Sequence, residues 1–261
     1  MKITLFTSNQ PRHNYFINLL SKNCKELFVI QESKTLFPGL LPSNYNISKK
    51  LEEYFKHVKK SEKKIFGLPY INSKNKKLIL NPLAVGDLNK CSTKMLKNFL
   101  QSDLYIVFGS SYIKGGLASF LCKKNALNIH MGVSPYYRGT DCNFWAMYDG
   151  NTNLVGATIH LLSKGLDSGP MLYHAMSKET KNPFDYTMLA VKSALDSIVK
   201  NIKNKKIKKF KKVLQSNKLL IRYSKKKDFT DKAINNFFLK VKKLKYKKIN
   251  KNLLKDPFFL K

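Results

Sequence analysis

The chain has 261 residues, of which 43% are hydrophobic and 12% aromatic. This length suits one α/β domain with an appended segment, and the apolar content is enough to bury a core, which excludes a wholly disordered chain. Its 49 basic and 16 acidic residues give a net charge of +33, and no run approaches the ~18 apolar residues of a membrane-spanning helix.

The first third of the chain opens with alternating strand and helix patterns. We expect a strand over 2–6, a helix over 14–20 and a strand over 26–31, which together start a right-handed βαβ unit. The polar, lysine-rich stretch that follows predicts helices over 49–60 and from Ser92, as a helix N-cap, to Leu100.

The signal for an α/β fold is clearest in the middle of the chain. Residues 104–108 are a continuous apolar run, which is typical of a strand buried in a parallel sheet. The patterns that follow predict strands over 126–131, 155–162 and 170–176 and helices over 143–148 and 185–202. We therefore predict a doubly wound, mostly parallel sheet of the Rossmann-like type.

The composition changes towards the C-terminus. Residues 200–261 carry about +20 of the net charge, and Leu and Phe recur at helical intervals over 233–244. We predict a catalytic domain over 1–180 and a lysine-rich, mainly helical segment over 181–261. Only three of the 49 basic residues are arginine, the residue that phosphate and base recognition prefers, so we interpret most of the charge as compositional.

The cysteines and the N-terminus indicate an intracellular protein. The four cysteines lack the paired spacing of a zinc site or a redox motif, so we expect reduced thiols and no metal. The N-terminus has no secretory signal pattern, which predicts a cytoplasmic location.

Three polar residues fall where strands are predicted to end. Asn128 and His130 lie two apart in one strand and therefore on the same face, and Asp167 lies in a turn between Gly165 and Gly169. The ligand crevice of an open α/β sheet lies at such strand ends. An amide, an imidazole and a carboxylate can together stabilise an oxyanion and move protons, as acyl transfer requires. A histidine buried in the core and an aspartate that only stabilises its turn would give the same residues.

Three ordered motifs give these residues a family context. They are NIHMGVSPYYRG over 128–139, VGATIH over 155–160 and GLDSG over 165–169. In this order they closely resemble the formyltransferase family that uses 10-formyltetrahydrofolate. The resemblance covers about 103–176. It implies that Asn128 and His130 stabilise the oxyanion formed when an amine attacks the formyl carbon, and that Asp167 orders the proton transfers.

The resemblance also implies a folate site. The segment 108–113 occupies the place of the family's folate loop, which predicts that the co-substrate 10-formyltetrahydrofolate contacts Phe108, Gly109, Ser110, Tyr112 and Ile113. Apolar walls and backbone polar groups are what a flat pterin needs. A buried strand that leads into a turn would give the same pattern.

Two of the three arginines lie near the expected crevice. Arg12 and its neighbour His13 follow the first strand, where doubly wound sheets commonly bind phosphate, so we expect them either to bind a diphosphate of the acceptor or to form a surface pair. Arg138 is expected either to bind a phosphate of the acceptor or to brace its loop. We interpret Phe144, Trp145 and His160 as core residues.

The motifs leave the acceptor amine open, and we favour a nucleotide-linked amino sugar. The segments 7–13, 221–224 and 228–230 are similar to enzymes that formylate such sugars for surface polysaccharides. Methionyl-tRNA formyltransferase suits a basic chain, but its family pattern adds a C-terminal β-barrel where this chain predicts helices. Phosphoribosylglycinamide formyltransferase needs a glycine-rich loop after the first strand, and residues 7–11 contain no glycine.

A different class of function remains an alternative: a lysine-rich nucleic-acid-binding protein on an inactive formyltransferase scaffold. The intact Asn128, His130 and Asp167 argue against it. The sequence does not identify the sugar, the nucleotide or the oligomeric state, a homodimer included. It also leaves open whether the C-terminal residues dimerise, cap the site or contact nucleic acid.

Overall fold

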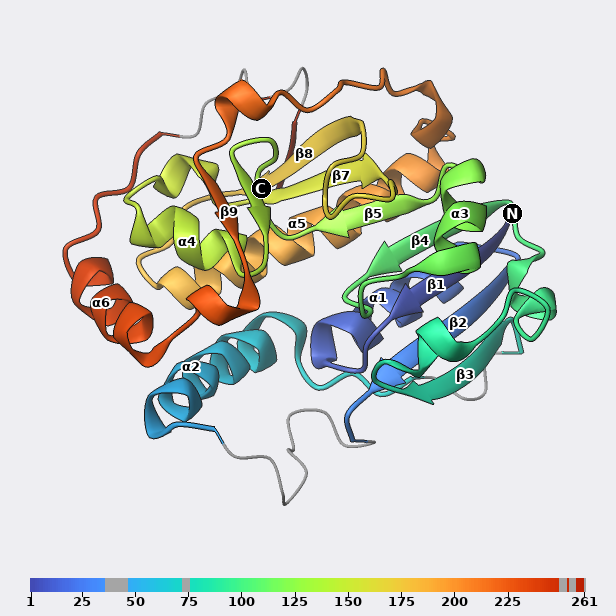
Figure 1. Ribbon diagram of the computed structural model, residues 1–261, viewed down its shortest axis with the longest axis horizontal. Helices are drawn as coiled ribbons and strands as arrows, with labels where there is room; N and C mark the ends of the chain where they lie inside the picture. The colour runs from blue at the N-terminus through green and yellow to red at the C-terminus, as the bar shows by residue number, and fades with distance from the viewer. Residues whose placement is uncertain (36–46, 72–75, 249–252, 254–256, 261) are drawn as a thin grey trace.

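An eight-stranded sheet forms the centre of the computed structural model, which describes residues 1–35, 47–71, 76–248, 253 and 257–260 (Figure 1). The strand order is β10-β8-β7-β5-β4-β1-β2-β3. The strands are β1 Lys2–Thr7, β2 Glu26–Ser33, β3 Leu78–Ala84, β4 Leu104–Phe108, β5 Leu127–His130, β7 Ala157–Leu161, β8 Met171–Ser177 and β10 Phe258–Leu260. All neighbours are parallel except β5–β7 and β7–β8. The predicted doubly wound, mostly parallel sheet is confirmed.

Helices cover both faces of this sheet because its strands are apolar on both sides. On β4, Ile106 packs with α1 (Pro11–Ser21) and α5 (Pro183–Lys203), whereas Val107 packs with α3 (Gly115–Lys123) on the opposite face. Figure 1 shows α3 in front of the sheet, with α1 and α5 behind it. Alternating side chains of one strand thus enter two separate cores.

A third core joins the C-terminal segment to the rest of the chain. It packs α6 (Asp231–Val241) against α4 (Cys142–Tyr148) and α2 (Lys49–Phe66) through aromatic side chains. Phe237 of α6 stacks on Phe144 with ring centroids 4.5 Å apart, and both rings are buried. Residues 181–261 therefore share cores with residues 1–180, and the boundary at 180 remains a prediction drawn from composition.

Several elements differ from the sequence patterns. The helix predicted up to Leu100 is wrong, because only the 3₁₀ turn Lys97–Leu100 forms there. The strand β3 was missed because it is an edge strand that contains Pro82 and exposes Ile79 and Leu80. The helical C-terminal part is present as α5 and α6, but the chain between them also forms β9 (Arg222–Ser224), which pairs with β6 (Tyr137–Gly139).

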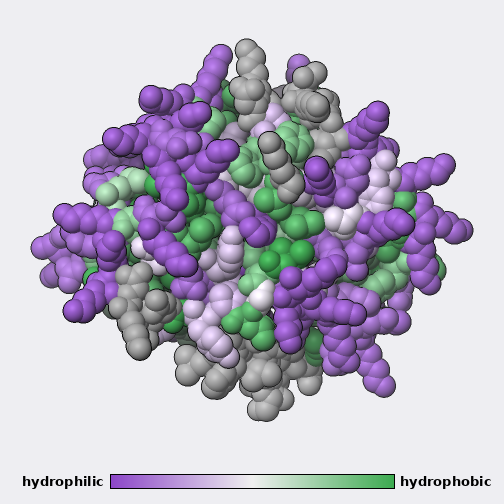
Figure 2. Space-filling view, turned by 180° about the vertical axis from the view of Figure 1, so that it is seen from behind, coloured by the Kyte–Doolittle hydropathy of each residue, from purple (hydrophilic) through white to green (hydrophobic). Residues whose placement is uncertain are grey.

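The surface reflects the composition. Seen from behind, Figure 2 shows hydrophilic residues on both sides of the molecule, with hydrophobic residues between them. No helix within the described ranges has the length and apolarity to cross a membrane. All four cysteines are free in the structure.

Candidate active site

A cavity of about 520 Å³ lies at the carboxyl ends of the central strands. The chain leaves β1 towards β2 and β3 on one side and continues from β4 towards β5 on the other, so the strand order reverses between β1 and β4. This is where an open α/β sheet binds its ligand. The cavity walls come from the loop after β4, the end of β5, the turn between β7 and β8, and the helices α2, α4 and α5.

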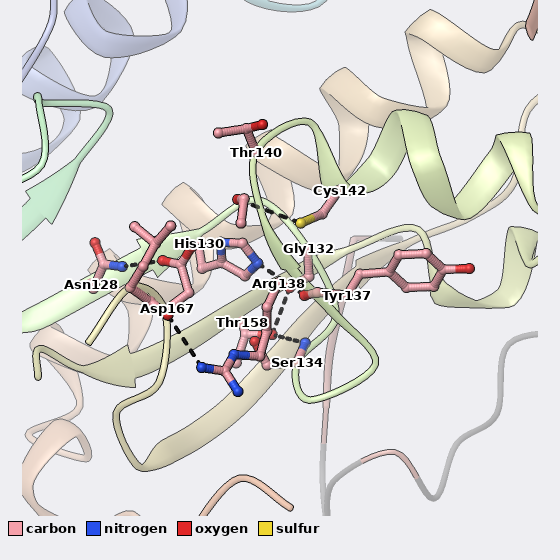
Figure 3. Close-up of polar contacts among 12 residues, drawn as sticks. Asn128, His130, Gly132, Ser134, Tyr137, Arg138, Thr140, Cys142, Thr158 and Asp167 are labelled. Carbon is pink, nitrogen blue, oxygen red and sulfur yellow. Dashed lines mark hydrogen bonds and ion pairs between the residues drawn. The ribbon is translucent and has the colours of Figure 1, made fainter. Parts of the chain in front are cut away.

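The structure brings Asn128, His130 and Asp167 together in this cavity (Figure 3). Asn128 Nδ2 lies 3.2 Å from Asp167 Oδ1, and His130 Nδ1 lies 3.3 Å from Asp167 Oδ2. The side chains of His130 and Asp167 are only 6% and 10% exposed. The three residues thus lie together, as the sequence predicts, and the Asp167 carboxylate lies between the Asn128 amide and the His130 imidazole.

A fourth side chain, His160, fixes the orientation of the Asn128 amide. The antiparallel register of β5 and β7 pairs Asn128 with His160. His160 Nδ1 donates to the Leu161 carbonyl at 2.8 Å, which leaves Nε2 to accept from Asn128 Nδ2 at 3.0 Å. His160 is buried, as its strand position predicted, but it also contacts a predicted catalytic residue.

His130 faces a hydrogen-bond acceptor on each side. Its Nε2 donates to the Tyr137 carbonyl at 3.2 Å, while Nδ1 faces the Asp167 carboxylate. Burial lowers the pKa of His130, and the charge of Asp167 opposes that effect. Burial alone would raise the pKa of Asp167, but His130 and His160 outweigh it and leave this pKa below its ordinary value. Asp167 is therefore ionised at neutral pH.

The Asp167 turn has a conformation that restricts its residues. Asp167 has a φ of 47°, in the left-handed region that few residues other than glycine adopt. A Cβ at Gly169 would lie 1.7 Å from the Leu161 carbonyl oxygen, so only glycine fits there. These constraints direct the Asp167 carboxylate towards β5.

The segment 108–113 lines the same cavity, as the folate-loop prediction requires. Gly109 has a φ of 73°, and a Cβ there would lie 2.4 Å from His13 Nε2. Ser111 is held by the buried carboxylate of Glu32, which accepts its backbone N–H at 2.6 Å and its hydroxyl at 2.9 Å. Glu32 also accepts the Gly86 N–H at 2.9 Å, so one carboxylate joins two loops.

Of the three residues predicted to bind the acceptor, two line the cavity and one does not. Arg12 and His13 line the cavity, but the Arg12 guanidinium forms a 2.7 Å ion pair with the buried Glu62. His13 packs against Phe108 with ring centroids 4.9 Å apart. Arg138 is not among the lining residues, and its Nη2 donates to the Leu166 carbonyl at 3.4 Å (Figure 3). The geometry therefore favours the bracing role of Arg138 over phosphate binding.

Sequence reasoning missed one wall of the cavity. Tyr54, Phe55 and Val58 project from α2, and Asp141 precedes α4. Burial raises the pKa of Asp141, although its surface is open to the cavity. The positions of the three α2 side chains depend on how α2 packs against α5 and α6, which no local pattern indicates. Within the described ranges, no group of three or more His, Cys, Asp and Glu side chains could hold a metal ion.

Comparisons with known proteins agree with this geometry. Residues 96–187 match the family model described as formyl transferase. A methionyl-tRNA formyltransferase of Thermosynechococcus vestitus is 34% identical over 73 residues, which is 28% of this chain and 22% of that protein. The match thus spans about a fifth of the length of the curated relative.

The likeness of the fold extends over the whole chain. A sugar N-formyltransferase from Shewanella sp. has a TM-score of 0.57 at 14% identity, covering 100% of this chain and 93% of that one. An N-formyltransferase from Helicobacter canadensis, solved with folinic acid and dTDP-3-aminofucose, has a TM-score of 0.54 at 13% identity, covering 96% and 85%. The matched segment 96–187 contains Asn128, His130 and Asp167, so the part of the chain that carries the candidate site is similar to the formyl transferase family, and the fold is similar to that of these solved enzymes.

Proposed function

We propose that this protein transfers the formyl group of 10-formyltetrahydrofolate to the primary amine of a nucleotide-linked amino sugar. The observation that carries the proposal is the contact of one carboxylate, Asp167, with both the Asn128 amide and the His130 imidazole inside a cavity. These groups supply charge stabilisation and proton transfer at one point, as acyl transfer requires.

The cavity suits a folate at the loop after β4. Val107, Phe108 and Ile113 give buried apolar walls, and Gly109 beside them is exposed to the cavity. When bound, the folate supplies the formyl carbon that the amine attacks. Phe108, Gly109, Ser110, Tyr112 and Ile113 would hold it, as the sequence predicts.

Asn128 and His130 would stabilise the negative charge that develops on the formyl oxygen. In the structure both N–H groups of Asn128 are engaged, the one towards His160 at 3.0 Å and the one towards Asp167 at 3.2 Å. The Asp167 contact is the longer of the two, and Asn128 would share that N–H between the carboxylate and the formyl oxygen. His160 keeps the amide nitrogen, rather than its oxygen, turned towards the reacting atoms.

Asp167 would direct the protons. The new C–N bond forms between the acceptor amine and the formyl carbon, and the bond from that carbon to the folate nitrogen breaks. A proton must leave the amine and reach the departing folate nitrogen. Asp167 is ionised and adjacent to His130, so the pair can take up this proton and return it.

The aromatic wall of the cavity supports a nucleotide-linked acceptor. Phe55 of α2 is 39% exposed and gives a flat surface on which a base can stack, and the Asp141 carboxylate lies in the same cavity. The Helicobacter canadensis structure, which shares this fold, contains both folinic acid and a dTDP-linked amino sugar. These observations together favour the sugar nucleotide.

The reaction is tested by incubating the protein with 10-formyltetrahydrofolate and a panel of nucleotide-linked amino sugars. We expect tetrahydrofolate and an N-formylated sugar in equal amounts, and no release of tetrahydrofolate when the amines are first acetylated. If no primary amine accelerates release above the rate without enzyme, the proposed reaction class is wrong.

A second acceptor, methionyl-tRNA, is favoured by a separate surface. A hollow of about 750 Å³ beside α4 and α6 is lined by five lysines: Lys240, Lys242, Lys243, Lys245 and Lys247. Such a surface suits a phosphate backbone, and the curated relative formylates methionyl-tRNA by its name. If tRNA is the acceptor, its KM rises steeply between low and physiological salt, whereas the KM of a sugar nucleotide changes little.

A further inference from the structure

The lysine-rich C-terminal segment reaches the Asp167 turn, which comprises residues 163–169. Val213 and Met171 form an antiparallel bridge with N–O distances of 2.8 and 2.9 Å. Two residues later, Gln215 contacts the turn, and Asn217 accepts a hydrogen bond from Arg138 at 3.0 Å. In Figure 1 this part of the chain is the orange coil drawn above β7 and β8.

Gln215 makes two hydrogen bonds to the backbone of the turn. Its Nε2 donates to the carbonyl oxygens of Asp167 and Gly169, each at 2.8 Å. Both N–H groups of the amide are therefore used, and the flipped amide would place its oxygen against two carbonyl oxygens. The Gln215 Oε1 atom is buried and has no hydrogen-bond partner in the described part of the chain. The side chain thus acts here as a donor only.

The turn needs such support because its central residue is strained. Asp167 has a φ of 47°, a conformation that costs free energy for a residue with a Cβ. Its carboxylate must nevertheless stay within 3.2 Å of Asn128 and 3.3 Å of His130. Arg138 holds the preceding carbonyl, that of Leu166, and Gln215 holds the carbonyl of Asp167 itself.

We propose that Gln215 is a positioning residue for Asp167, and that the C-terminal segment is thereby part of the framework of the active site. The kinetic effects that we expect of Gln215 variants rest on the proposed formyl transfer. The structural effects rest on the geometry alone. Gln215 lies outside residues 96–187, the part of the chain that matches the family model.

The test replaces Gln215 by methionine, which has a similar length and no donor. We expect Gln215→Met to lower kcat about 10- to 100-fold, because small displacements of a catalytic group have effects of this size. The KM values of both substrates should stay within about threefold, since neither substrate is bound by Gln215. The control is Leu214→Ala, whose side chain is 80% exposed in the same segment, and which should keep wild-type kcat.

Two further measurements separate positioning from a loss of folding. Gln215→Lys keeps a donor for both carbonyls and should retain most of the activity. The titration of the His130 ring, followed by NMR and assigned by its loss in His130→Ala, should move to lower pH in Gln215→Met. The cause is that the Asp167 charge, which favours protonated His130, lies farther away. The other groups that face this ring are His160 on β7, Arg138 on β6 and the Cys142 thiol on α4, and Gln215 holds none of them.

The outcomes are decisive in both directions. Wild-type kcat and an unchanged His130 titration in Gln215→Met would overturn the proposal, and so would equal losses in the methionine and lysine variants. If the wild-type protein transfers no formyl group, the proposed function fails. The His130 titration still decides the role of Gln215 in that case.

Discussion

Asp167 is the residue on which the site depends. It contacts Asn128 and His130 and lies 3.8 Å from His160 Nε2, while its own side chain is 10% exposed. A buried carboxylate stays ionised only when nearby groups compensate for its lost hydration, and the histidines keep the pKa of Asp167 below its ordinary value. The proposed role of Asp167 in proton transfer therefore starts from the ionised carboxylate beside His130.

Replacing either member of the His130–Asp167 pair should stop turnover without unfolding the chain. We expect His130→Ala and Asp167→Ala each to lower kcat at least ~100-fold, the usual size of acid–base and oxyanion effects. Steady-state kinetics and urea unfolding measure the two properties. Asp87→Ala, which removes a carboxylate that is paired with Lys90 on the surface, is the control. Near-wild-type turnover in either variant would remove that residue from the mechanism.

At the scale of elements, the ends of strands carry the site, and residues from distant strands and segments hold it in place. Asn128 and His130 come from β5, Glu32 from the end of β2 and His160 from β7. The loop after β4 has its conformation because the Glu32 carboxylate accepts two hydrogen bonds from Ser111 and one from Gly86. Hydrogen bonds to a charged group are among the stronger ones in proteins.

Glu32→Gln should weaken folate binding selectively. The variant keeps the size of the side chain but turns an NH₂ group towards donors of the folate loop, so at least one bond is lost. We expect the KM for 10-formyltetrahydrofolate to rise about tenfold, which corresponds to about 1.4 kcal/mol, with little change in kcat. Glu26→Gln, at the opposite end of the same strand, is the control. An unchanged folate KM, or an equal rise in the KM of the acceptor, would contradict this role.

Most of the sheet and the core of the site could be predicted from the sequence, because both follow from local patterns. Apolar runs gave β4 and β7, and the two-residue period placed Asn128 and His130 on one face. The helix α3 was missed because it begins with two glycines, and β3 because it is exposed and contains a proline. The supporting residues His160, Glu32 and Gln215 contact the site only through tertiary packing, which local spacing does not indicate.

At the scale of the whole molecule, three buried histidines link stability to pH. Burial lowers the pKa of His13 and His130, and it lowers that of His174 from 6.5 to about 4. Below pH 6.5 the unfolded chain therefore takes up protons that the folded chain does not. The free energy of unfolding falls as the pH decreases through this window, which for His174 extends down to about 4.

The share of His174 in this pH dependence can be measured separately. Each histidine with a lowered pKa adds up to about 1.4 kcal/mol per pH unit to the slope of the unfolding free energy against pH. Urea unfolding at several pH values between 7 and 5 measures this slope. His174→Gln keeps a donor for the Ser134 carbonyl, which His174 Nε2 contacts at 2.7 Å, but it cannot titrate. We expect a shallower slope in this variant. The same slope as in the wild type would show that His174 does not carry the effect.

The proposed reaction is the transfer of a formyl group to a nucleotide-linked amino sugar at the Asn128, His130 and Asp167 site. Its most direct test is the initial rate of formyl transfer from 10-formyltetrahydrofolate, measured side by side for a panel of nucleotide-linked amino sugars and for methionyl-tRNA at physiological salt. We predict that a sugar nucleotide has the higher kcat/KM and that Asp167→Ala abolishes its formylation. Efficient formylation of methionyl-tRNA with none of the sugars, or transfer that survives in Asp167→Ala, would contradict this account.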